Sequence, residues 1–306
     1  MDPNNPFYRQ VALLVQLLPI VGTQRCFALK GGTAINLFVR DLPRLSVDID
    51  LAYLPPNNRE AALAEIDAAL KAIATEVERR FPGCQINAQP DRDTNSLLKL
   101  TISANEAVVK IEVTPVLRGA VFDPELRVVR PSVEKEFGFA ELQLLNFADL
   151  YAGKLCAALD RQHPRDLYDV HLLLENEGLS DELMQAFLVY LIGHNRPMAE
   201  LLAPRLKPIS DAYEAEFAEM VFEEVGVATL EATFHRLVES IHTRMSDDDR
   251  AFLLSIKRGE PKWAHLRLPH IEELPSVRWK LLNLDRMAAD KRSEAVGNLE
   301  NVLQVG

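Results

Sequence analysis

The hydrophobic pattern of this chain changes character near residue 134. Before that point, short runs of β-forming residues alternate with helical segments; after it the alternation disappears and helical segments continue to the C-terminus. With 306 residues the chain is long enough for two domains with buried cores. The pattern therefore predicts an α/β (α+β) N-terminal domain with a small mixed sheet, over residues 1–135, followed by a mainly α-helical C-terminal domain, over residues 136–306.

The first part of the sequence separates into distinct expected elements. A short apolar run at 26–29 is followed by a glycine-containing break and then by helical spacing at 34–40. The clearest amphipathic helix covers residues 58–81, and the tripeptide Ala-Asn-Glu at 104–106 suits a hairpin. The expected strands lie at residues 47–54, 84–89, 96–103, 107–116 and 125–130.

The composition excludes several classes of protein. A formal charge of −11 argues against a protein that coats nucleic acid through a broadly basic surface, although the stretch 257–280 is locally basic. No apolar run approaches the roughly 18–20 residues that span a bilayer, and the N-terminus lacks the pattern of a signal peptide. Three widely separated cysteines indicate neither a disulfide framework nor a zinc site. We expect a cytoplasmic protein with no membrane partner.

Two aspartates interrupt the strand-like run at 47–54. Residues two apart in a strand face the same side, so Asp48 and Asp50 point together while Ile49 and Leu51 enter the core. Two ionised carboxylates at close range repel each other unless a cation lies between them. The pair is therefore either part of a solvated strand face or a site for a hard cation such as Mg²⁺, which carboxylates and substrate phosphates hold together.

Two further features accompany this pair. Gly31 and Gly32 stand between an apolar run and a helical segment, where a backbone without Cβ atoms allows a ligand to approach closely; a plain tight turn is the alternative. Glu112 lies on the face of its strand that also carries Lys110, opposite the apolar face. It is either a third carboxylate beside the aspartates or a surface partner of Lys110.

The order of these elements resembles the DNA polymerase β-type nucleotidyltransferase superfamily, whose usual form has Gly-Ser and a shorter gap before the aspartates. The longer stretch LKGGTAINLFVRDLPRLSVDIDL is similar to the AbiEii/AbiGii toxin family, including its mycobacterial MenT members. That family's Gly-Gly-Thr and Arg-x-Ser-x-Asp-x-Asp patterns match Gly31, Gly32, Thr33, Arg44, Ser46, Asp48 and Asp50.

A second block, at residues 149–175, resembles the family's Lys-x-x-Ala…Arg…Arg-Asp-Leu-x-Asp signature. Taken by itself, the block reads as a pair of salt-bridged surface helices. The two blocks and the strands between them cover roughly residues 25–175. The residues of the second block that match are Lys154, Arg161, Arg165, Asp166 and Asp169.

The resemblance implies a Mg²⁺-dependent toxin that transfers NMP from an NTP to an acceptor, in a toxin–antitoxin or phage-defence system. Asp48 and Asp50 would hold one or two Mg²⁺ ions, and Glu112 would be the third carboxylate. Lys154 would be catalytic, Asp169 would be a catalytic candidate, and Asp166 would orient the nearby basic side chains. The residues expected to contact the substrate are Gly31, Gly32, Thr33, Arg44, Ser46, Arg161, Arg165 and Asp166.

The acceptor implied by the MenT members is the 3′ end of tRNA, which the basic stretch 257–280 would contact despite the net negative charge. A cognate antitoxin is the expected protein partner. Two other functions are consistent with the same residues. Acidic residues and a lysine on neighbouring strands also suit a metal-dependent nuclease, and the fold could serve as a non-catalytic binding module.

Overall fold

The computed structural model describes residues 5–116 and 118–304. The chain forms two compact units, and each unit is built from two separate stretches of the sequence. The first unit comprises Met1–Asn146 together with the short segment Met220–Glu223. The second comprises Phe147–Glu219 and Glu224–Gly306. The expected division into domains at 135/136 stays a prediction.

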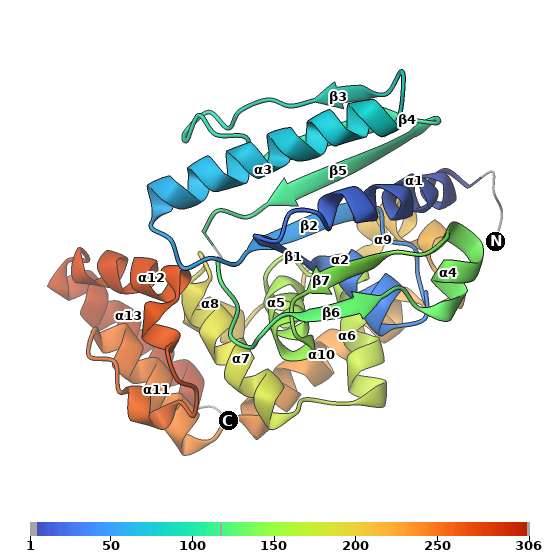
Figure 1. The fold of residues 1–306 in the computed structure, drawn as a ribbon. Helices are drawn as coiled ribbons and strands as arrows, with labels where there is room; N and C mark the ends of the chain where they lie inside the picture. Colours follow the sequence, from blue (N-terminus) through green and yellow to red (C-terminus); the bar gives the residue numbers. More distant parts are fainter. Residues whose placement is uncertain (1–4, 117, 305–306) are drawn as a thin grey trace. The chain divides into compact units, whose positions relative to one another are not determined.

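The first unit is built on one mixed sheet, drawn from blue to green in Figure 1. In the described residues the sheet has seven strands in the order β3-β4-β5-β2-β1-β7-β6. At its centre β2 pairs antiparallel with β1 and parallel with β5. The strands are β1 (Phe27–Lys30), β2 (Asp48–Tyr53), β3 (Gln85–Asn87), β4 (Lys99–Ala104), β5 (Ala107–Val113), β6 (Glu125–Val128) and β7 (Glu141–Leu144).

Helices cover this sheet. Helices α1 (Pro6–Val21) and α3 (Arg59–Arg80) pack against the strands and against each other (Figure 1), and their buried residues are mostly aliphatic. Burial of their aliphatic side chains supplies the main stabilisation of this layer. Asn58 begins α3 because its side-chain oxygen accepts a hydrogen bond from the amide of Ala61. The remaining helical segments are α2 (Gly31–Ala34), the π-helix η1 (Ile35–Val39) and α4 (Pro131–Phe137).

Most expected elements of the first unit are confirmed, with shifted ends. The predicted hairpin joins β4 to β5, and its two turn residues, Asn105 and Glu106, have the positive φ angles that tight antiparallel turns require. The helical segment expected at 34–40 is instead a short α-helix that continues as a π-helix. The prediction that alternation ends near residue 134 is wrong, because β7 is an alternately buried strand paired with β1 and β6.

The second unit is helical throughout its described residues. Helix α5 packs on both α6 and α7, α10 packs on α6, and α13 packs on α11. No helix in the described residues is long and apolar enough to cross a membrane. The α-helices are α5 (Phe147–Asp160), α6 (Pro164–Asn176), α7 (Asp181–Gly193), α8 (Met198–Leu202), α9 (Ser210–Glu216), α10 (Val227–Arg244), α11 (Asp247–Arg258), α12 (Pro275–Asp285) and α13 (Ala289–Gln304), and the 3-10 turns are η2 (Ala218–Met220), η3 (Trp263–His265) and η4 (Ile271–Glu273).

Local signals in the sequence fix several of these helix ends. Ser246 and Asp249 form a reciprocal capping box at the start of α11, and Gly259 ends the same helix in the left-handed conformation. His163 caps α6 through a hydrogen bond that its Nδ1 accepts from the amide of Arg165, and Pro164 occupies the first turn. The turn between α5 and α6 is therefore defined by side chains close to it in sequence.

Candidate functional site

A row of charged residues crosses four neighbouring strands of the sheet. Lys30 on β1 lies opposite Asp50 on β2, which lies opposite Glu112 on β5, which in turn lies opposite Lys99 on β4. Registered partners on adjacent strands share a face, so the four side chains project to the same side. Asp48, two residues from Asp50, adds a second carboxylate to that face, and the buried Ile49 between them confirms the expected alternation.

Glu112 therefore lies beside Asp50, in agreement with the first of the two alternatives that the sequence left open. Its carboxylate forms an ion pair with the ammonium group of Lys99, not with Lys110. Lys110 is registered instead against Asp48. The alternative in which Glu112 is the surface partner of Lys110 is wrong, because the antiparallel pairing of β4 with β5 places Lys99 directly opposite Glu112. The Lys99–Glu112 pair is half-exposed on both sides, where ion pairs contribute only about 0–1 kcal/mol.

The carboxylates on this face do not by themselves enclose a cation. Among the residues that the structure describes, no three His, Cys, Asp or Glu side chains are grouped so that they could hold a metal ion. Mg²⁺ commonly takes only one or two protein carboxylates and completes its coordination with substrate phosphates and water. The donor chemistry of Asp48 and Asp50 therefore fits a metal that arrives with a phosphorylated substrate.

Gly31 brings the backbone into contact with this acidic face. Its φ angle is +73°, a conformation that residues with a Cβ atom adopt at a cost. A Cβ atom at this position would lie 2.5 Å from Oδ2 of Asp50. The first glycine of the pair is thus required both by its backbone conformation and by the close approach of the Asp50 carboxylate.

The second glycine packs against a buried polar cluster formed by Thr33, Arg44 and Ser46. A Cβ atom on Gly32 would lie 2.8 Å from Nη2 of Arg44 and 2.9 Å from Oγ of Ser46. The Thr33 hydroxyl lies 3.1 Å from the Ser46 hydroxyl and donates a hydrogen bond of 2.5 Å to the carbonyl oxygen of Asp48. Thr33 and Arg44 are 1% and 2% exposed. These contacts hold the start of β2 against the glycine turn.

Lys30 is the residue of this region that sequence reasoning missed. Its Nζ donates a hydrogen bond of 3.1 Å to Oγ1 of Thr114. Burial lowers the pKa of Lys30, although the negative charges of Asp50 and Glu112 act in the opposite direction. Its position directly before Gly31 was the available signal, but only the strand pairing shows that it faces the carboxylates.

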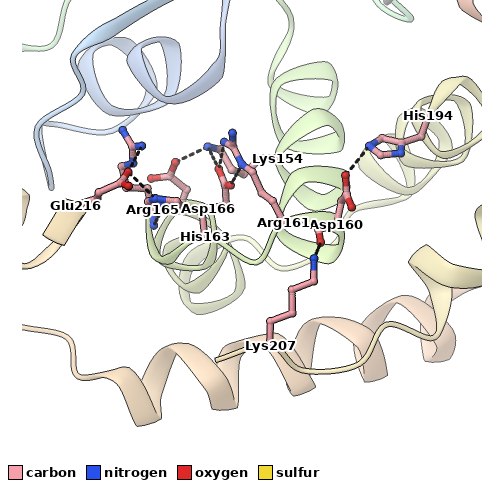
Figure 2. Close-up of polar contacts among 10 residues, drawn as sticks. Lys154, Asp160, Arg161, His163, Arg165, Asp166, His194, Lys207 and Glu216 are labelled. Atoms are coloured by element: carbon pink, nitrogen blue, oxygen red, sulfur yellow. Dashed lines mark hydrogen bonds and ion pairs between the residues drawn. The ribbon is translucent and has the colours of Figure 1, made fainter. Parts of the chain in front are cut away.

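In the second unit, α5 and α6 bring together the residues of the second sequence block (Figure 2). Nζ of Lys154 lies 2.8 Å from Oδ1 of Asp166 and 2.9 Å from Oδ2 of Asp169. The two carboxylates are fully buried and the lysine is 6% exposed. The alternative of a pair of salt-bridged surface helices is wrong for these three residues, because their side chains form a buried ionic cluster.

Arg161 completes this cluster from the solvent side. Its Nε lies 2.5 Å from Oδ2 of Asp166 and its Nη2 lies 3.0 Å from Oδ1, while its side chain remains 64% exposed. Burial favours the neutral form of Asp166, but Lys154 and Arg161 together outweigh it and hold the pKa of that carboxyl well below its usual range. Asp166 is therefore ionised. The guanidinium group of Arg161 pairs with this carboxylate and is itself exposed at the protein surface.

Arg165 lies apart from this cluster. Its Nη2 is 3.3 Å from Oε2 of Glu216, and the same oxygen lies 3.1 Å from Nε2 of His163 (Figure 2). A neighbouring group surrounds Asp160, which forms an ion pair of 2.7 Å with Nη1 of Arg196. The second block thus contributes one buried ionic cluster and one partly exposed arginine, which pairs with Glu216 of α9.

Comparison with known protein families shows the family to which a chain with these residues belongs. The sequence model of the family described as "Nucleotidyl transferase AbiEii toxin, Type IV TA system" matches residues 12–283. The chain belongs to this AbiEii family. The match includes both glycines, the β2 aspartates, Glu112 and the whole of the ionic cluster on α5 and α6.

A solved structure supports the fold of this AbiEii protein. MenT4, a nucleotidyltransferase toxin from Mycobacterium tuberculosis, is similar with a TM-score of 0.59 at 18% sequence identity; the match covers 91% of this chain and 93% of that chain. At this level of identity the likeness concerns the mixed α/β fold alone. No curated protein matches the sequence significantly. The roles expected for the individual site residues stay predictions.

Proposed function

We propose that this AbiEii protein transfers NMP from an NTP to the 3′ end of an acceptor RNA, with tRNA as the leading candidate, and that pyrophosphate is released. The observation that carries the proposal is the shared face of Asp48, Asp50 and Glu112 directly beside the close-packed backbone of Gly31. Membership of the nucleotidyltransferase toxin family supports it. Such a toxin acts together with a cognate antitoxin, which is the protein partner that we propose.

Asp48 and Asp50 are the residues that would hold Mg²⁺. When bound, the ion would neutralise charge on the triphosphate and on the transition state. Glu112 would act as the third carboxylate and accept the proton of the attacking hydroxyl. Its present partner, Lys99, is half-exposed, so exchange of that ion pair for substrate costs little.

The glycine turn and its buried supports have separate roles in this proposal. Gly31 and Gly32 let the backbone approach the phosphates, and the hydroxyl of Ser46 adds a polar contact beside them. Thr33 and Arg44 are almost wholly buried, so we assign them to holding the turn against β2. This assignment narrows the set of direct phosphate contacts expected from the sequence.

The second block would supply positive charge to the substrate. Arg161 is the best candidate for a phosphate contact, because its guanidinium group is anchored by Asp166 and yet mostly exposed. Arg165 is partly exposed and would contribute in the same way. Lys154 lies between two buried carboxylates, so its charge is already compensated, and it would act by holding Asp169 in place.

The test is incubation of the purified protein with Mg²⁺, total tRNA and each labelled NTP separately. The wild type should label and lengthen RNA, whereas Asp48→Ala should reduce labelling by at least ~100-fold, because the developing charge loses its electrostatic stabilisation. Asp93→Ala, an exposed position between β3 and β4, removes the same charge as a control and should leave labelling unchanged.

Other outcomes would contradict the proposal. Shortening of RNA without any NTP would indicate a metal-dependent nuclease. Cellular toxicity that survives Asp48→Ala unchanged would indicate a non-catalytic binding module. Labelling of protein in place of RNA would place the acceptor in a different chemical class.

A further inference from the structure

A cavity of 230 Å³ lies within the second unit, among the C-terminal end of α7, the last turn of α11 and the exposed side of α12. No acidic residue contributes to the lining of this cavity, to the extent that the structure describes it. Its polar and aromatic lining consists of His194, Asn195, Lys257, Trp279, Lys280 and Asn283. The cavity is therefore cationic in a protein whose net charge is −11.

Lys257 is the most unusual of these residues. Its side chain is 7% exposed, and in the described part of the chain its ammonium group has neither a hydrogen-bond acceptor nor an ion-pair partner. Burial lowers the pKa of Lys257. Partial desolvation of a cation that lacks a partner costs free energy. A ligand that brings negative charge into the cavity would remove that penalty.

Lys280 lines the same cavity from α12. Its Nζ donates a hydrogen bond of 2.8 Å to the carbonyl oxygen of His194, which fixes the ammonium group at the end of α7. Burial, followed by repulsion from Lys257, lowers the pKa of Lys280 to about 8. Two lysines on different helices thus repel each other across one cavity, which is the electrostatic arrangement of an anion site.

We propose that this cavity binds a backbone phosphate of the acceptor RNA, held between Lys257 and Lys280. The volume is below the roughly 300 Å³ at which pockets for whole small molecules begin, so it suits a phosphate group and not a complete NTP. The side-chain amides of Asn195 and Asn283 can donate further hydrogen bonds to phosphate oxygens.

Trp279 favours RNA over other sources of phosphate. Its indole is 46% exposed at the cavity, and exposed aromatic rings beside a cationic site stack the bases of single-stranded nucleic acid. The identity of the ligand as acceptor RNA rests on the proposed nucleotidyl transfer. This site also narrows the broad basic stretch at 257–280 to one cavity, since Arg258 in that stretch is paired with Glu300.

The test measures binding of fluorescently labelled tRNA to the full-length protein without NTP, so that it does not depend on catalysis. Lys257→Met keeps the side-chain volume, and Lys280→Gln keeps a hydrogen-bond donor. Each change should weaken tRNA binding by about tenfold. Each should also lower the slope of log affinity against log salt by about 0.7 for every phosphate that the variant no longer neutralises. Binding of NTP should remain as in the wild type.

Lys262→Gln discriminates between this cavity and a general basic surface. Lys262 is exposed, lies five residues from Lys257 and carries the same charge, and its substitution should change tRNA affinity less than twofold. Equal weakening by all three variants, or wild-type affinity for both cavity variants at an unchanged melting temperature, would overturn the proposal. In that second case, continued NMP transfer by the wild type would leave the proposed function standing.

Discussion

Gly31 carries two separate constraints in a single residue. The left-handed backbone conformation alone favours glycine, but the same is true of Gly83, whose φ is +86°. The difference is that a Cβ atom on Gly83 would meet nothing within 4 Å, whereas one on Gly31 would collide with the carboxylate of Asp50. An alanine at Gly83 would therefore introduce backbone strain alone, whereas an alanine at Gly31 would introduce the same strain and also displace the Asp50 carboxylate.

We expect Gly83→Ala to lower the free energy of unfolding by about 1–2 kcal/mol, the usual strain of an alanine in this conformation, and to leave NMP transfer intact. Gly31→Ala should cost more than that and should reduce transfer by at least ~10-fold, because the Asp50 carboxylate must move. Urea unfolding and the labelling assay measure the two effects. Equal activity in the two variants would mean that the position of Asp50 is not critical.

At this scale the sequence predicts which side chains share a face but not their partners. Strand alternation correctly placed Asp48 and Asp50 together and put Glu112 on the polar face of β5. The pairing of Glu112 with Lys99, and of Lys30 with Asp50, depends on the register between strands that are distant in sequence. No local pattern encodes that register, since a shift of pairing leaves each strand's own periodicity unchanged.

At the scale of elements, α5 and α6 are joined by a buried ionic cluster. Lys154 on α5 forms ion pairs with both Asp166 and Asp169 on α6, and all three side chains are buried. The pair of Lys71 and Asp67 on α3 has a similar separation of 2.6 Å, but its lysine side chain is 67% exposed. A lysine–aspartate ion pair thus occurs once with a buried lysine, Lys154, and once with an exposed lysine, Lys71.

Removal of the charge at Lys154 should therefore be far more damaging than removal at Lys71. Lys154→Met leaves two buried carboxylates with reduced compensation and should lower the free energy of unfolding by about 3–5 kcal/mol. Lys71→Met should lower it by about 0.2–1 kcal/mol. Chemical denaturation measures both. A small effect at Lys154, combined with loss of NMP transfer, would instead indicate direct contact between Lys154 and the substrate.

Element prediction succeeded where the signal was local and failed where it was tertiary. The hairpin at Asn105 and Glu106 and the helix α3 follow from turn chemistry and periodicity. Strand β7 is only four residues long and is stabilised as a strand by pairing with β1 and β6. The π-helix η1 arises likewise without any composition that distinguishes it from an α-helix.

At the scale of the whole molecule, each unit contains a cysteine whose reactivity measures whether that unit is folded. Cys26 belongs to the first unit, where burial and then the charge of Glu65 raise the pKa of its thiol to about 11. Cys156 lies on α5 in the second unit, and burial raises the pKa of its thiol as well. Because the thiolate is the reactive form, both should be protected at neutral pH.

We expect iodoacetamide at a pH of about 7.5 to modify Cys84, which is partly exposed, before Cys26, and to leave Cys156 unmodified until the second unit unfolds. Raising the pH should accelerate modification of Cys26, as its thiolate fraction grows. Peptide mass spectrometry along a urea series follows each site. Modification of Cys156 at the rate of Cys84 in the native protein would contradict its burial.

The membership of the AbiEii family and its nucleotidyltransferase fold were recognisable from two sequence blocks. The sequence did not reveal which segments belong to which unit, because that depends on tertiary contacts between segments that are far apart along the chain. The residues Met220–Glu223 illustrate this: they follow a long helical stretch, yet they pair with the strand-like residues around Arg44.

That pairing has a practical consequence for any attempt to produce the sheet-containing part alone. The amide of Leu45 donates to the carbonyl oxygen of Met220, at 2.7 Å, and Arg44 forms a β-bridge with Val221. A recombinant fragment that stops at Asn146 would lack this short returning segment. It would expose unpaired backbone groups beside the glycine turn, whereas adding residues 220–223 through a designed linker would restore the missing edge.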